Sequence, residues 1–93
     1  MTTRPLPSDQ HAIYELAPGL LLVFKPRGHS ERVHTHSHTQ RLRVIRGRLR
    51  VTTDDVVVTI DAASDPLTLA AQTAHATEAL VDTWLIAETV ARA

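Results

Sequence analysis

The sequence predicts an all-β fold in which one small domain forms a sandwich or a closed barrel. Short runs of β-branched and aliphatic residues follow one another at close intervals, with turn-forming residues between many of them. No long stretch shows the sustained period of an amphipathic helix. Many short strands separated by turn signals are typical of sandwiches and barrels. The length of 93 residues is that of a single domain.

The elements follow in order along the chain. Residues 1–11 carry two prolines and no apolar period, so we expect an N-terminal arm or edge strand there and the barrel in residues 12–93. Pro18-Gly19 ends the first strand, and Asp54-Asp55 is expected to form a hairpin turn. The predicted strands are 12–16, 20–24, 32–36, 41–46, 48–52, 56–60, 67–71, 75–80 and 83–88.

Aliphatic side chains must fill the core, because aromatic residues make up only 3 % of the chain. We expect Tyr14 and Phe24 in the core, and Trp84 in the core or in a dimer contact. Residues 20–24 are apolar at every position, so both faces of that strand need cover, which favours a homodimer. The further predicted core residues are Leu42, Val44, Leu49, Val51, Val58, Leu67, Leu69 and Leu85.

Composition excludes several classes of function. Ten basic residues balance ten acidic ones, which argues against a general nucleic-acid binder. There is no cysteine, so disulfides, iron–sulfur ligation and thiol nucleophiles are excluded. The N-terminus lacks the apolar core of a signal peptide, and the longest apolar run, residues 19–24, is too short to span a membrane. We therefore expect a cytoplasmic protein without a membrane partner.

Histidines are concentrated in one segment that is a candidate metal site. Three of the six histidines fall within residues 34–40. In a strand, residues i and i+2 point to the same face about 6.6 Å apart, so His34 and His36 would form two walls of a site for one ion. Gln40 can join them only if the chain bends between Ser37 and Thr39. A solvated turn is the alternative interpretation of this polar segment.

The residues around this segment resemble the first motif of the cupin superfamily. That motif runs Gly, five residues, His-X-His, three or four residues, Glu, six residues, Gly. Here Gly28 precedes His34-Thr35-His36 by five residues, three residues lead to Gln40, and six more lead to Gly47. The spacing matches at every step. The one departure is Gln40, where the family usually has glutamate.

The second cupin motif is similar in spacing but not in residues. It runs Gly, five residues, Pro-X-Gly, two residues, His, three residues, Asn. Placing His75 on the motif's histidine leaves Ser64, Ala70, Gln72 and Ala79 on its glycine, proline, glycine and asparagine positions. Together the two motifs span residues 28–79. The resemblance implies a single small double-stranded β-helix (jelly-roll) barrel of the cupin type.

Carried over residue by residue, the resemblance implies four metal ligands: His34, His36, Gln40 and His75. Three neutral imidazoles and a neutral amide would leave the full charge of a divalent ion in place, which strengthens its Lewis acidity. The alternative role of Gln40 is to donate a hydrogen bond through its amide to a bound water or substrate. One divalent transition metal per chain is expected, and Fe, Mn, Ni, Cu and Zn all suit such a site.

No clear catalytic acid or base appears, so no catalytic residue is assigned. Glu31 precedes His34 by three residues and Glu78 follows His75 by three, and strand parity puts each on the opposite face from its histidine. His38 is expected to face solvent or the rim of the substrate pocket once the chain has bent. His11 and His29 have no placement that argues for function.

A basic segment follows the histidines, with arginines at positions 41, 43, 46, 48 and 50. We expect a solvated sheet face paired with acidic residues on neighbouring strands, and an anion site is the alternative. Arg46 has the parity of Gln40 and Leu42 and is predicted to be able to point into the barrel.

Three functions stay open at this point. The first is a small metal-binding cupin that acts as an oxygenase-like enzyme on a small-molecule substrate, and we expect it to be a homodimer. The second is a binding or sensing module without turnover. The third is a degenerate barrel with a purely structural role, since fold does not fix function.

Overall fold

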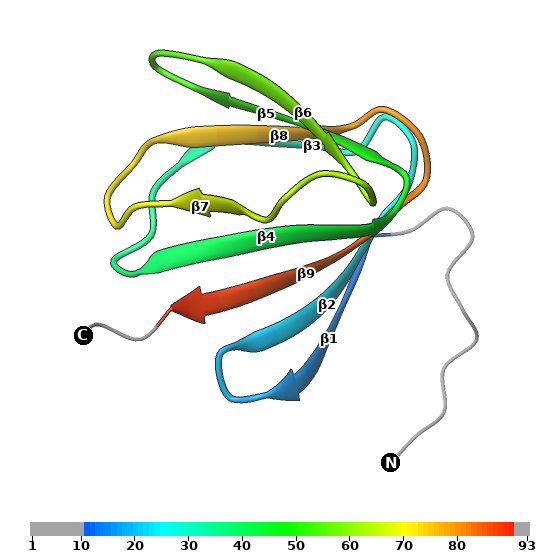
Figure 1. Ribbon diagram of the computed structural model, residues 1–93, viewed down its shortest axis with the longest axis horizontal. Helices are drawn as coiled ribbons and strands as arrows, with labels where there is room; N and C mark the ends of the chain where they lie inside the picture. Colours follow the sequence, from blue (N-terminus) through cyan, green and yellow to red (C-terminus); the bar gives the residue numbers. More distant parts are fainter. Residues whose placement is uncertain (1–10, 91–93) are drawn as a thin grey trace.

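The structure is a computed structural model and describes residues 11–90, which form two antiparallel sheets facing each other (Figure 1). One sheet has the strand order β1-β2-β9-β4-β7 and the other β3-β8-β5-β6. The strands are β1 (Ala12–Ala17), β2 (Leu20–Lys25), β3 (Ser30–His34), β4 (Thr39–Arg46), β5 (Arg48–Thr53), β6 (Val57–Asp61), β7 (Leu67–Leu69), β8 (His75–Ala79) and β9 (Thr83–Val90).

The all-β fold class is confirmed, and each of the nine predicted strands is present with shifted ends. Within residues 11–90 no helix is long and apolar enough to cross a membrane. The turn between β5 and β6 contains Asp54 and Asp55, and the Thr53 N–H donates to the Val56 carbonyl at 2.8 Å. The predicted arm or edge strand over residues 1–11 lies outside the described residues, except for His11.

The core lies between the two sheets and is aliphatic, as predicted. Leu42, Val44, Leu49, Val51, Leu69 and Leu85 are buried, and Val58 and Leu67 are partly buried against them. Phe24 is also buried. Tyr14 was expected in the core, and Trp84 in the core or in a dimer contact. Both lie half-buried on the outer face of the five-stranded sheet, because Phe24 pairs with Trp84 on the side opposite the inner Val23–Leu85 pair.

The turn between β4 and β5 is fixed by Gly47, which has a φ of +101°. A Cβ atom at this position would lie 2.4 Å from the Asp82 carbonyl oxygen and 2.7 Å from the Cα of Thr83. The buried Thr83 hydroxyl accepts a hydrogen bond from the Arg48 N–H at 3.1 Å. Glycine is needed here both for the backbone conformation and for the close approach of the β8–β9 turn.

The arginines of β4 and β5 lie on exposed or half-exposed positions of the sheets. Arg41 pairs with Glu88 at 3.4 Å and Arg50 with Glu78 at 2.8 Å. Arg46 was predicted to be able to face the interior, and this is wrong. Val44 is opposite Leu85 and Arg46 is opposite Trp84, so one extra residue on β4 forms a bulge that turns Arg46 outward.

Candidate metal centre

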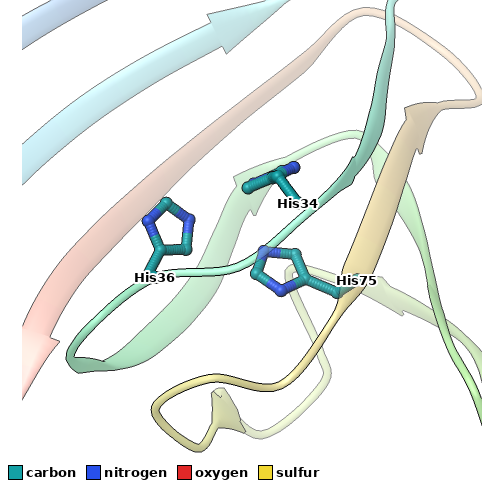
Figure 2. A group of neighbouring side chains, drawn as sticks. All are labelled: His34, His36 and His75. Carbon is teal, nitrogen blue, oxygen red and sulfur yellow. The ribbon is translucent and has the colours of Figure 1, made fainter.

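Three histidines from different parts of the chain converge at one end of the barrel. His34 ends β3 and lies directly opposite His75, the first residue of β8, while His36 comes from the segment after β3. The ring centroids are 4.4 Å apart for His34 and His75, 4.9 Å for His34 and His36, and 5.3 Å for His36 and His75. Figure 2 shows the three rings around a shared space.

The strand argument for His36 needs correction, because β3 ends at His34. His36 lies in the connection to β4, and the predicted bend follows at Ser37 and His38. The His36 carbonyl accepts a hydrogen bond of 2.8 Å from the N–H of Gln72, in the turn before β8. That bond, rather than strand parity, holds the segment so that His36 meets His75.

The ring orientation of two histidines is set by backbone carbonyls. His34 Nδ1 lies 2.7 Å from the Arg32 carbonyl oxygen, and His75 Nδ1 lies 3.0 Å from the Thr73 carbonyl oxygen. A carbonyl only accepts, so each Nδ1 must carry the proton and donate it. In the neutral ring the Nε2 atom then has a free lone pair, which is the form of imidazole that binds a metal ion.

The pKa of His36 is lowered by burial and, to a smaller extent, by the neighbouring His34, His75 and His38. A lowered pKa favours the neutral ring that metal binding requires. His38 is half-buried, and its ring centroid is 5.3 Å from that of His36. It belongs neither to the converging set nor to the pocket lining.

The three histidines open into a pocket of about 160 Å³ between the two sheets. Gln40 of β4 lines this pocket with them, so the structure brings together the four residues that the sequence singled out. Most of the remaining wall is aliphatic and comes from Leu21, Val23, Leu42, Leu49, Leu85 and Ala87. The pocket is smaller than those that hold drug-sized ligands and suits a molecule of a few carbon atoms.

Glu31 was predicted to lie on the opposite face from His34, and the structure corrects this. Glu31 is opposite Thr77 and His34 is opposite His75, so β3 advances by three residues where β8 advances by two. The extra residue is a bulge, and it returns Glu31 to the inner face, where it lines the pocket. Glu78 does face outward, as predicted, and pairs with Arg50.

Lys25 is a pocket residue that sequence reasoning missed. It is 4 % exposed and forms an ion pair with Glu31. Burial lowers the pKa of Lys25 to about 8. The sequence contained the information needed to place Lys25, because it follows the inward-facing Leu21 and Val23 at alternate positions of one strand.

His11 and His29, for which the sequence offered no role, stack on each other with ring centroids 4.3 Å apart. Together with Glu31 they form a second group whose potential ligand atoms lie within 4.8 Å of one another. Burial and the positive charge of Lys25 lower the pKa of both histidines. This group borders the pocket, which His11 lines.

No protein-family model and no curated protein matches this chain. Among solved structures, a cupin superfamily protein from Desulfitobacterium hafniense aligns with a TM-score of 0.78 and 18 % identity, covering 98 % of this chain and 84 % of its own. KdgF from Halomonas sp. aligns with a TM-score of 0.67 and 26 % identity, covering 84 % and 74 %.

A third similar structure is an RmlC-like cupin family protein from Methanocaldococcus jannaschii, described as a double-stranded β-helix. Its TM-score is 0.73 at 10 % identity, covering 94 % of this chain and 86 % of its own. All three structures share the overall fold of this chain. At these identities the likeness concerns the fold, and the function of this chain has to be argued from its own pocket.

Proposed function

Because this chain has the cupin fold, we propose that it is a small metal-binding cupin that binds a small organic molecule at the metal. His34, His36 and His75 would hold one divalent transition metal. The observation that carries the proposal is the convergence of one ring nitrogen from each histidine, all within 4.8 Å of one another. Two nitrogens that each bind one ion at about 2.1 Å are at most about 4.2 Å apart, so small side-chain rotations suffice.

The chemistry of the donor set supports a metal. His34 and His75 present a free Nε2 lone pair because a backbone carbonyl holds the proton on Nδ1. The pKa of His36 is lowered by burial, which favours the neutral ring that binds a metal. Packing three imidazoles this closely without an ion offers no hydrogen bond between lone pairs, whereas an ion would satisfy all three.

Gln40 is the proposed fourth residue of the site, either as a ligand through its carbonyl oxygen or as a donor to a bound ligand through its amide. In both cases the protein adds no negative charge to the ion, unlike a site with glutamate. When bound, the metal supplies Lewis acidity and open positions for the oxygen atoms of a ligand. Fe, Mn, Ni, Cu and Zn all suit such a set.

Metal analysis of untagged protein tests the site. We expect about one equivalent of a transition metal per chain after supplementation and dialysis. His36→Ala should lose the metal. His38→Ala is the matched control and should keep it, because the His38 ring lies beside the histidine triad (His34, His36 and His75) but outside it. Less than about a tenth of an equivalent in the wild type would overturn the proposal and favour a structural barrel.

Whether the bound molecule is turned over is a separate question. We propose an oxygenase-like activity on a small enol, phenol or diketone, with a non-catalytic binding module as the alternative. Oxygen uptake by the Fe-loaded protein across such a panel, with His36→Ala as control, separates the two. Binding of a panel member without oxygen uptake or product would favour the binding module.

We also propose that the protein is a homodimer in the cytoplasm. Support for the dimer comes from the outer face of β1, β2 and β9, where the half-buried rings of Tyr14 and Trp84 lie 6.3 Å apart between centroids. Leu22 pairs with Ile86 on the same face. Light scattering should give the mass of two chains, and Trp84→Glu should give that of one. A wild-type mass of one chain would contradict the dimer.

A further inference from the structure

The pocket contains a second polar cluster, formed by Lys25, Glu31 and Thr77, beyond the three histidines. On the inner face of β3 and β8, Glu31 lies opposite Thr77 and His34 lies opposite His75. Thr77 is two residues further along β8 than His75, which corresponds to about 7 Å. The two polar groups thus occupy consecutive rungs of one wall, with the histidines at one end and the Lys25 cluster at the other.

Two features of this cluster indicate a ligand. Lys25 is the only lysine in the chain, and it is buried at the pocket wall, where an ammonium group is costly unless its donors are used. Thr77 is 7 % exposed, and among residues 11–90 its buried Oγ1 atom has no hydrogen-bond partner. A buried hydroxyl without a partner is destabilising unless a ligand or water satisfies it.

The charges around the pocket favour an anion. The titratable groups that line it are Lys25, Glu31, His11 and the three histidines of the triad. The Lys25–Glu31 pair is neutral as a whole, and the imidazole rings of His34, His36 and His75 carry no charge in the form that binds a metal. A divalent ion therefore leaves the pocket with a net positive charge.

We propose that Lys25 and Thr77 bind a carboxylate at one end of a small ligand whose other end coordinates the metal, with Glu31 orienting the Lys25 ammonium. This inference rests on the proposed function, because it needs the metal at His34, His36 and His75. It narrows the ligand to short molecules with a metal-chelating group and a second, ionised carboxylate. Hydroxy and keto dicarboxylates of four or five carbons have this form and suit the pocket volume.

The rival use of this region is a second metal bound by His11, His29 and Glu31. Two observations disfavour it. The Lys25 ammonium already pairs with Glu31, so a cation is present where the second ion would bind. The rings of His11 and His29 are stacked at an interplanar angle of 26°, so their lone pairs run nearly side by side instead of converging on one point.

The experiment compares two probes that differ only in the distal carboxylate. Calorimetry with Zn-loaded full-length protein would compare its affinities for 2-hydroxybutanedioate (malate) and 2-hydroxybutanoate. The two probes have the same chain length and the same chelating end. We expect the wild type to bind malate at least about tenfold more tightly. Lys25→Met should abolish this preference and Thr77→Val should reduce it severalfold, while both variants keep one equivalent of zinc.

Arg50→Met is the matched control, because Arg50 forms an exposed ion pair with Glu78 outside the pocket. It should leave the preference for malate unchanged. Equal affinity of the wild type for both probes would overturn the proposal, as would a preference that survives in Lys25→Met or, if that variant does not fold, a preference that is undiminished in Thr77→Val. A second equivalent of zinc lost in His29→Ala would overturn it in favour of the rival site.

A measurement of the metal content of the wild type tests the proposed function separately from this inference. If the wild type holds no metal, the proposed function fails, and the cluster is then tested on the metal-free chain with succinate, which needs no chelation. Succinate binding that is lost in Lys25→Met would still support a carboxylate site, and no binding would overturn it.

Discussion

His34 and His75 lie directly opposite each other on the antiparallel strands β3 and β8. Both rings are held by backbone carbonyls at Nδ1, from Arg32 and Thr73. Two of the three proposed ligands therefore belong to one rung of a sheet, and the third, His36, is tied to the turn before β8 through the Gln72 N–H. A site built on rigid elements in this way needs little reorganisation to bind an ion.

The first prediction concerns the protonation of these two rings. In metal-free protein above pH 8, ¹⁵N NMR of the imidazoles should show the proton on Nδ1 and a free Nε2 at both His34 and His75, because only a donor can bond to a carbonyl oxygen. Adding zinc should shift the two Nε2 resonances most. A proton on Nε2 of either ring would contradict the orientation described for that histidine.

The second prediction concerns Gln40. Gln40→Glu places a negative charge in the pocket with the three histidines and should tighten zinc binding by at least about tenfold, measured by competition with a chelator. Thr35→Glu is the control, since it adds the same charge at an exposed position beside the site. An equal effect of both variants would mean that Gln40 does not lie near the ion.

The third prediction is a pH dependence of stability caused by Lys25. Its pKa is lowered by burial from 10.5 to about 8, so between these pH values the unfolded chain binds more protons than the folded one. The free energy of unfolding should therefore rise with pH across this window, by at most about 1.4 kcal/mol per pH unit. Below pH 8 Lys25 should cause no such slope.

Lys25→Met isolates this effect, because the chain has no other lysine. Urea unfolding of chelator-treated protein, followed by the fluorescence of Trp84, would be measured from pH 7 to pH 10. The wild type should gain stability relative to the variant as the pH rises. Parallel profiles would show that the Lys25 amine is not desolvated in the folded state.

The fourth prediction compares two glycines with positive φ. Gly28→Ala meets no atom within 4 Å at a φ of +85° and should cost only about 1–2 kcal/mol. Gly47→Ala meets the Asp82 carbonyl oxygen at 2.4 Å and should cost at least about 2 kcal/mol more, because backbone atoms cannot rotate away. Similar midpoints of urea unfolding for the two variants would refute this close approach.

The periodicity of the sequence was sufficient for the strands and most of the core. Leu42, Val44, Leu49 and Val51 were predicted from alternation and are buried, because a strand with one face on the core must place every second residue inside. The spacing of the first motif predicted that His34, His36 and Gln40 share one site, and all three line the pocket. His75 was reached through the resemblance to cupins, and the structure brings it opposite His34.

Strand alternation predicted the wrong face for a side chain where a strand contains a bulge or ends early. Glu31 and Arg46 were each assigned to the wrong face, because a bulge adds one residue that no local pattern announces. The outward position of Trp84 likewise depends on its pairing with Phe24 in a neighbouring strand.

The sequence by itself determined an all-β domain with a histidine-rich segment and the residue types that a metal site requires, because side-chain alternation and donor chemistry are local properties. Only the tertiary structure decided that His75 faces His34 and that Lys25 and Glu31 share their pocket. These relations join residues from separate strands, and cross-strand register together with one bulge determines which side chains meet.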